Sequence, residues 1–158
     1  MIELNKKTQQ DFLNREWVQR LLDAGVDMSD AKYRIITVSK TGMDYIILST
    51  RLHEREDWLD KITDNIPTYT VSELLYKLHE WIYPTIDGEE YSGGLRVAKD
   101  APFYFAFYDL KNKEGKKKTE KFFAEFEYPI ESLASLLIQC HKKDIGIKVK
   151  DTGDISDK

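Results

Sequence analysis

Apolar residues recur at helical spacing in three stretches of the chain. Thr8 is a candidate N-cap for the first stretch, and Gly25 follows its end. Pro129 suits the first turn of the third stretch, and Gly146 is expected to end it. Spacing of three and four residues places the apolar side chains on one face of each helix. The expected amphipathic helices cover residues 8–24, 71–82 and 129–145.

The second helix has the most complete start signal in the chain. Thr70 stands three residues before Glu73, the spacing of a capping box in which each side chain binds the other residue's backbone N–H. Tyr69 and Leu74 flank the box, as in a hydrophobic staple. We expect the apolar stripe that follows to continue to Ile82, and Pro84 to stop the helix.

Alternating and β-branched residues predict two hairpins. The first has two strands rich in Tyr, Ile, Val and Thr, joined by the short break at residues 39–42. In the second, aromatic residues alternate along both strands, and the lysine-rich segment 111–119 joins them. The expected strands are residues 33–38, 43–50, 103–110 and 121–128.

The remaining segments have weaker patterns. Residues 51–66 are interpreted as a connector with room for one helical piece around Trp58, Leu59 and Ile62. Turns are predicted at Thr63-Asp64-Asn65, Asp87-Gly88 and Gly93-Gly94, and a short strand at residues 95–97. Residues 150–158 are polar, so we expect a flexible C-terminal tail.

The order of elements predicts an α+β fold. We expect a single domain over residues 1–149, in which an antiparallel sheet of two hairpins packs against about three helices. A chain of 158 residues with 41% hydrophobic residues is long enough for such a core. A net charge of −4, with 33% charged residues of both signs, is typical of an ordinary protein surface and argues against bulk electrostatic binding of nucleic acid.

The single cysteine, Cys140, excludes an intramolecular disulfide and favours a reducing compartment. Residues 1–7 lack the apolar core of a signal peptide, and no apolar run reaches membrane-spanning length. We therefore expect a cytoplasmic protein without membrane attachment.

Histidine and carboxylate residues are the candidates for catalysis or metal binding. His53 lies among Glu54, Glu56 and Asp57, but the spacing matches no ligand pattern, and a solvated charged loop is the better interpretation. His79 and His141 are interpreted as partly buried or surface residues of their helices. A nucleophilic pair of Cys140 and His141 is disfavoured because adjacent helical residues point in different directions.

Acidic residues near the first helix also invite a metal-binding interpretation, namely Asp23, Asp27, Asp30 and Asp44. Helix caps and turns explain them better, because no downstream carboxylate motif completes a two-metal site. Glycine-rich phosphate loops, zinc-protease and serine-hydrolase motifs are missing from the sequence. We therefore predict no catalytic residue, no metal site and no cofactor.

The lysine-rich segment between Lys111 and Lys121 is the strongest charge feature. Lys116, Lys117 and Lys118 next to aromatic strands are candidate contacts to single-stranded nucleic acid. Neighbouring acidic residues such as Glu114 dilute the charge, so a solvated hairpin tip is the preferred interpretation.

Three blocks of sequence, residues 17–33, 66–75 and 129–138, resemble a group of uncharacterised small proteins from bacterial prophages and mobile elements. These blocks consist of helix caps and core stripes, and residues 139–142 depart from the group's apolar and aromatic ending. The resemblance implies an accessory protein of a mobile element and supplies no catalytic residue.

Taken together, the sequence favours a non-enzymatic protein-interaction or accessory domain whose partner is an unknown protein. Two alternatives stay open. One is an enzyme that uses histidine and carboxylates, and the other is a weak nucleic-acid binder acting through the Lys111–Lys121 loop. The sequence leaves the oligomeric state open.

Overall fold

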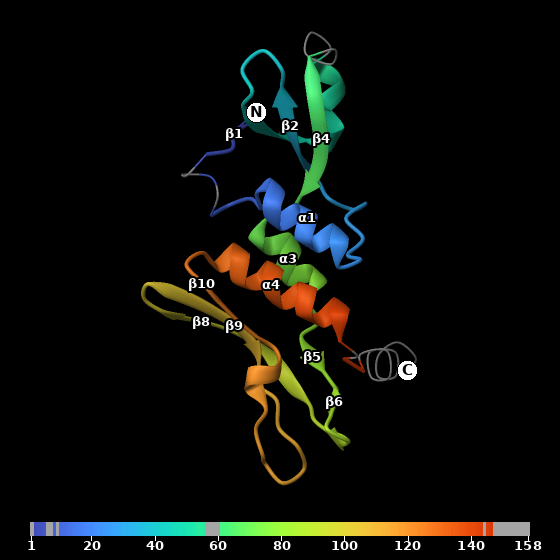
Figure 1. The fold of residues 1–158 in the computed structure, drawn as a ribbon, viewed down its shortest axis with the longest axis vertical. Helices are drawn as coiled ribbons and strands as arrows, with labels where there is room; N and C mark the ends of the chain where they lie inside the picture. The colour runs from blue at the N-terminus through green and yellow to red at the C-terminus, as the bar shows by residue number, and fades with distance from the viewer. Residues whose placement is uncertain (1, 6–7, 9, 56–60, 144, 147–158) are drawn as a thin grey trace. The chain divides into compact units, whose positions relative to one another are not determined.

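The strand pairings of the described residues define an α+β fold with two four-stranded antiparallel sheets and one two-stranded hairpin. The computed structural model (Figure 1) describes residues 2–5, 8, 10–55, 61–143 and 145–146. The chain divides into two compact units, Met1–Leu74 and Leu75–Lys158. Each predicted hairpin is confirmed, and each belongs to the sheet of a different unit. The expected single domain over residues 1–149 stays a prediction.

The first unit contains a sheet in the order β1-β3-β2-β4. The inner strand β2 (Tyr33–Val38) carries Ile35 and Ile36, whose side chains point to opposite faces of the sheet and are both fully buried. Its elements are β1 (Ile2–Glu3), α1 (Arg15–Asp23), β2 (Tyr33–Val38), β3 (Asp44–Leu48), the 3-10 helix η1 (Ser49–Arg55) and β4 (Ile62–Thr68).

Helix α1 begins seven residues later than the predicted start at Thr8. Asn14 is the N-cap, and its side chain accepts a hydrogen bond from the Trp17 N–H at 3.1 Å. Residues 12 and 13 are extended instead, because the Leu13 N–H donates to the Tyr69 carbonyl and Thr68 donates to the Leu13 carbonyl. The predicted end at Gly25 is confirmed, since this residue has a φ of 90° after the last turn.

Strand β4 replaces part of the predicted connector. The turn predicted at Thr63-Asp64-Asn65 is wrong, because Asp64 and Asn65 pair with β2 and Thr63 lies at a register shift within β4. Asn65 also accepts a hydrogen bond from the Arg34 side chain on β2. The 3-10 helix η1 lies before the helical piece expected around Trp58, Leu59 and Ile62. Of these three residues, Ile62 begins β4, and Trp58 and Leu59 lie outside the described residues.

The capping box is confirmed at the start of α3 (Val71–Lys77). The Glu73 N–H donates to the Thr70 hydroxyl at 3.2 Å, and the Thr70 N–H donates to the Glu73 carboxylate at 3.0 Å. The predicted extension to Ile82 is wrong, because Trp81 and Ile82 form strand β5. Pairing of β5 with the glycines that begin β8 outweighs the helical apolar pattern.

The second unit contains a sheet in the order β10-β9-β8-β5 and a small hairpin of β6 and β7. Helix α4 packs on one face of this sheet against β9 and β10 (Figure 1). On that face, Ala106, Tyr108 and Ala124 are buried, and the Ser132 hydroxyl of α4 donates to the Tyr104 carbonyl at 2.7 Å. The elements are β5 (Trp81–Ile82), β6 (Thr85–Ile86), β7 (Glu89–Glu90), β8 (Gly93–Asp100), β9 (Phe103–Tyr108), the 3-10 helix η2 (Thr119–Lys121), β10 (Phe123–Phe126) and α4 (Pro129–Lys142).

The two predicted glycine turns have different outcomes. Asp87 and Gly88 both have positive φ and connect β6 to β7, so that turn is confirmed. Gly93 and Gly94 instead begin β8. A Cβ atom on Gly93 would lie 2.1 Å from the Asp109 carbonyl oxygen, so the backbones approach too closely for any side chain. The predicted tail at residues 150–158 lies outside the described residues.

Candidate functional site

The face of the second sheet opposite α4 is lined by aromatic rings. Alternation along β9 places Phe103, Phe105 and Phe107 on this face, and pairing with β10 adds Phe123. The ring centroid of Phe123 lies 5.6 Å from that of Phe105 and 5.9 Å from that of Phe107. Phe103 and Phe123 are 41% and 37% exposed, which is high for phenylalanine. We call this set, together with Trp81 and Arg96, the open aromatic face.

Trp81 and Arg96 extend the open aromatic face towards β5. Trp81 is opposite Gly94 in the ladder and is 46% exposed. Arg96 is opposite Phe107, so its guanidinium belongs to the same face as the ring. A shallow pocket of about 290 Å³ lies here. Its lining comprises Trp81, Ser92, Gly94, Arg96, Asp109, Lys111 and Asn112.

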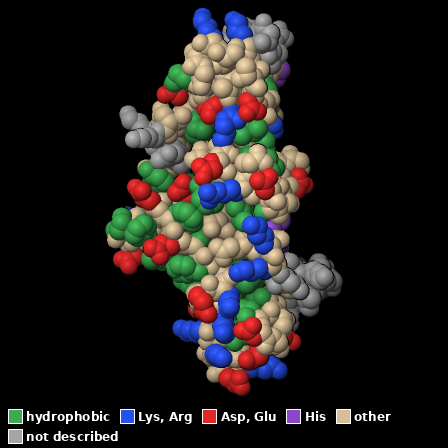
Figure 2. All heavy atoms as spheres, in the orientation of Figure 1, with side chains coloured by type: hydrophobic (Ala, Val, Ile, Leu, Met, Phe, Trp, Pro, Cys, Tyr) green, Lys and Arg blue, Asp and Glu red, His purple; other side chains and the backbone are tan. Residues whose placement is uncertain are grey.

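Hydrophobic side chains reach the molecular surface around this sheet. Figure 2 shows green hydrophobic side chains over the end of the β8–β9 hairpin, with carboxylates between them. Val97 on β8 is 48% exposed there. The alternation of aromatic residues predicted apolar side chains on both faces of this sheet. It did not predict which of the two faces α4 would leave open.

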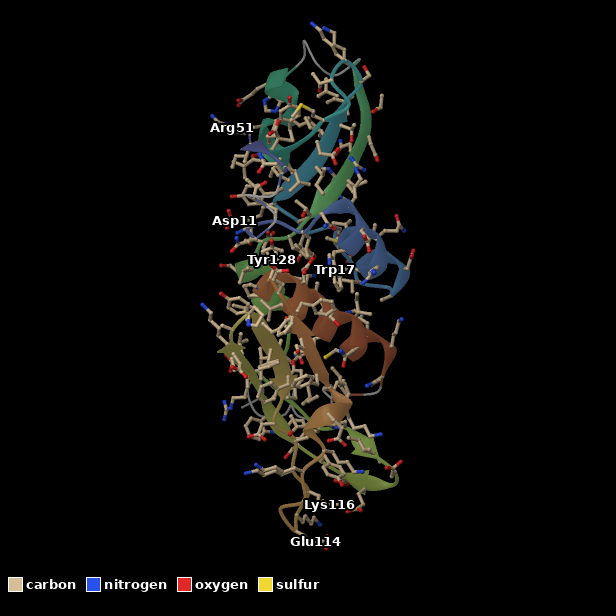
Figure 3. All side chains as sticks on the ribbon, turned by 60° about the vertical axis from the view of Figure 1, so that its left-hand side comes forward. Asp11, Trp17, Arg51, Glu114, Lys116 and Tyr128 are labelled. Carbon is tan, nitrogen blue, oxygen red and sulfur yellow. The ribbon has the colours of Figure 1, made fainter. Side chains whose placement is uncertain are left out.

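The three candidate nucleic-acid contacts lie in an ordered loop. Asn112 organises this loop, because its side-chain oxygen accepts from the Lys116 N–H at 2.8 Å. The backbones of Lys117 and Lys111 form an isolated antiparallel β-bridge, and the Lys118 Nζ lies 3.9 Å from the Asp87 carboxylate. Figure 3 shows Lys116 and Glu114 together at the tip of the loop. Acidic side chains therefore dilute the positive charge of the loop, as expected.

A second pocket brings two histidines and the cysteine together. It has a volume of about 280 Å³, and its titratable lining residues are Lys77, His79, Cys140 and His141. Burial lowers the pKa of His141, and the electrostatic influence of the nearby Lys77 and His79 lowers it further. This grouping was missed in the sequence because the residues come from segments about 60 positions apart, which no local motif records.

Cys140 in this pocket is poorly suited to nucleophilic chemistry. Burial raises the pKa of its thiol to about 12, and the side chain is 7% exposed. The thiolate is the reactive form, so at neutral pH this group stays protonated. Tyr108 lies close to Cys140, and the Tyr108 hydroxyl donates to the His79 carbonyl at 2.6 Å. These contacts connect β9 to the segment after α3 and so stabilise the fold.

The other histidine and the four aspartates do not line this pocket. His53 is exposed on η1, and its predicted neighbours Glu56 and Asp57 are outside the described residues. Within the described part of the chain, no group of three or more His, Cys, Asp or Glu residues could hold a metal ion. Asp23 accepts from Gln19, Asp27 accepts from the Ser29 N–H, Asp30 accepts from the Tyr69 hydroxyl, and Asp44 binds Arg15.

Arg15 forms a polar cluster in the first unit. Its Nε and Nη2 atoms bind the two Asp44 carboxylate oxygens at 3.2 and 2.9 Å, and it also binds Asp64 and Thr37. Burial raises the pKa of Asp44, but hydrogen bonds from Arg15 and Thr37 outweigh this effect, and the net pKa is lowered. The cluster links α1 to three strands, and every charge in it is paired, so its role is structural.

Comparison with known proteins gives no match, since no protein-family model, curated protein or solved structure is similar to this chain. The described residues contain no helix of the length and apolar character needed to cross a membrane.

Proposed function

We propose that this chain is a non-enzymatic protein-interaction domain and that the open aromatic face is its interaction surface. The observation that carries this proposal is the exposure of three large rings on one sheet face, those of Trp81, Phe103 and Phe123. A cytoplasmic location and an accessory role in a mobile element form part of the same proposal.

The composition of the open aromatic face supports protein binding. Aromatic residues and arginine are enriched in protein interfaces and dominate their binding energy. A fully covered aromatic side chain buries about 150–250 Å², and Trp81, Phe103 and Phe123 still expose 46%, 41% and 37% of their surface for such a contact. Arg96 and Lys111 at the β5 end supply charged groups for a polar rim.

An enzyme that uses the histidine pocket is the first alternative. His79 and His141 lie close to each other there, which favours proton transfer. The thiol of this pocket, however, is protonated at neutral pH, and the described residues of the lining include no carboxylate that could act as a general base.

Single-stranded nucleic acid is the second alternative ligand. Bases stack on exposed aromatic rings, and the open aromatic face provides such rings next to Arg96. The lysine loop would add phosphate contacts through Lys116, Lys117 and Lys118. Asp87 and Glu114 next to this loop, and the net charge of −4, disfavour the alternative.

Site-specific photocrosslinking tests the proposal. A benzophenone amino acid replaces Phe123 in the full chain, and a matched variant carries it at Tyr76, which is 88% exposed and belongs to no part of the open aromatic face. Irradiation in cells that naturally produce the protein should give a defined protein adduct at position 123 and none at position 76. Equal adducts at both positions, or no adduct, would contradict the proposal. An adduct to nucleic acid would favour the second alternative.

A further inference from the structure

One edge of the second sheet is unpaired over half the length of β8. Strand β5 pairs only with Gly93 and Gly94, and the Leu95 N–H donates to the Glu80 carbonyl at 2.9 Å. Beyond Leu95, no described strand pairs with β8 on this side. The Gly94 carbonyl accepts from Asp109 on the β9 side. Backbone groups alternate along a strand, so the N–H and C=O groups of Val97 and Lys99 point outward from the open edge.

At the opposite edge of the same sheet, a side chain of α4 covers the backbone of Phe123. The Gln139 amide donates to the Phe123 carbonyl at 2.8 Å and accepts from the Phe123 N–H at 3.1 Å. Lys143 donates to the Lys121 carbonyl nearby. A glutamine side chain therefore takes the place of a neighbouring strand at Phe123, and this prevents pairing of another strand with that residue.

The β8 edge lacks the usual lysine protection, although Lys99 lies on it. Edge lysines discourage pairing when their charge extends over the free backbone groups. The ammonium of Lys99 instead lies 5.4 Å from the ring centroid of Tyr104, on the neighbouring strand β9. The backbone of residues 97–100 is thus left accessible, and Val97 is 48% exposed.

We infer that this edge pairs with the same edge of a second copy of the chain. In the pairing, β8 lies antiparallel to the partner's β8 about a two-fold axis through Ala98. This register places Val97 opposite Lys99 of the partner subunit, and both residues have outward-pointing backbone groups, as a hydrogen-bonded pair requires. Ala98 then faces the partner's Ala98 as a non-hydrogen-bonded pair.

Charge complementarity selects this occupant and this register. Arg96 is opposite the partner's Asp100, and Asp100 is opposite the partner's Arg96, on the face opposite α4. Both side chains are exposed, and the described residues supply no ion-pair partner to either. An axis through Lys99 would bring two ammonium groups together. An axis through Val97 would place Arg96 opposite alanine, so neither alternative gains an ion pair.

The pairing goes beyond the proposed interaction surface, because it joins two four-stranded sheets into one continuous sheet. The aromatic faces of the two copies would then lie on the same side of that sheet. A partner with two matching surfaces would bind such a dimer more tightly than one copy.

Charge-swap variants test the dimer by sedimentation equilibrium of the full chain. The wild-type chain should show a concentration-dependent monomer–dimer equilibrium. Arg96→Asp and Asp100→Arg should each raise the dimer dissociation constant roughly tenfold, because each variant places like charges opposite each other twice. The double variant should restore dimerisation. A double variant as weak as the single variants, with the native circular dichroism spectrum retained, would overturn the proposal.

Disulfide trapping tests the register. In Ala98→Cys, the two cysteines would face each other at about 4.5 Å between Cα atoms, within the range that a disulfide spans. Mild oxidation should crosslink this variant, whereas Val97→Cys and Lys99→Cys should stay uncrosslinked when each is alone. Cys140 is buried and does not compete. A monomeric wild-type chain whose Ala98→Cys variant does not crosslink would overturn the dimer. Crosslinking of the Ala98→Cys variant only to a different protein would overturn the dimer, and it would mean that the β8 edge pairs with a strand of that protein.

Discussion

Gln139 binds both backbone groups of Phe123, although the two residues are sixteen positions apart. The contact gives a helix side chain the role of a β-strand, and it holds β10 at the edge of the sheet next to the Phe123 ring. It also keeps that ring in place at the border of the open aromatic face.

We predict that Gln139→Ala opens this edge. Loss of two hydrogen bonds should lower the free energy of unfolding by about 0.5–1.5 kcal/mol per bond, towards the lower end because the site is exposed. Hydrogen exchange at the Phe123 amide should become faster, while exchange at the central strand β9 should change less. Gln139→Glu is the matched control, because its carboxylate still accepts from the Phe123 N–H. Unchanged exchange at Phe123 in the alanine variant would contradict the role of this contact.

Removal of the capping box should destabilise the start of α3. Thr70→Ala loses the acceptor for the Glu73 N–H, and we expect the free energy of unfolding to fall by about 0.5–2 kcal/mol. Urea denaturation measures this change. Thr70→Ser keeps the hydroxyl and should retain most of the stability, so an equal loss in both variants would mean that the threonine methyl group, not the cap, is responsible.

Acid should weaken the Arg15 cluster. The pKa of Asp44 is lowered in the folded chain, so its ionised form stabilises the fold above the unfolded pKa of about 3.9, and this stabilisation is lost as the pH falls through the folded value. The free energy of unfolding, measured from pH 7 to pH 2, should fall more steeply for the wild-type chain than for Asp44→Asn. Parallel pH profiles of the two proteins would show that ionisation of Asp44 does not contribute to the stability of the fold.

Cys140 should react slowly with alkylating agents in the folded protein. Burial raises the pKa of the thiol to about 12, so at pH 8 very little thiolate is present. Mass spectrometry after iodoacetamide treatment should show little labelling in buffer and complete labelling in urea. Rapid labelling of the folded chain would revive the hypothesis of a nucleophilic cysteine next to His141.

Gly93→Ala should disrupt the start of β8. The new Cβ would lie 2.1 Å from the Asp109 carbonyl oxygen, so the backbones at residues 93 and 109 would have to move apart. In Gly94→Ala the nearest atoms belong to the Trp81 ring at 3.1 Å, and a side chain can shift more easily. We expect a larger loss of thermal stability for Gly93→Ala, and a reversed order would contradict the close backbone approach.

Local signals predicted a large part of the fold. The capping box at Thr70, the hairpin break at residues 39–42 and the proline start of α4 all act within a few residues, and all three are confirmed. The errors arose where distant segments compete with local preference. Helix α3 ends at Lys77 because β8 pairs with residues 81–82, and α1 begins at Arg15 because residue 13 bonds to the segment around Tyr69.

The candidate sites depended on information that a single sequence does not carry. Alternation along residues 103–108 predicts that at least half of the rings are core, and burial of Tyr108 beside the partly exposed Phe107 agrees. The identity of the open face follows only from the packing of α4. The Arg15 cluster joins residues from four elements, and no spacing rule connects them.

The exposure of Trp81 makes the open aromatic face directly observable by fluorescence. Trp17 is 6% exposed in the first unit, whereas Trp81 is 46% exposed on the open aromatic face. In a Trp58→Phe variant, which removes the third tryptophan of the chain, quenching by iodide should therefore act on the Trp81 emission far more than on the Trp17 emission. A ligand that covers the face would shift the Trp81 emission to shorter wavelength and protect it from the quencher, so occupancy can be followed in solution without any added label.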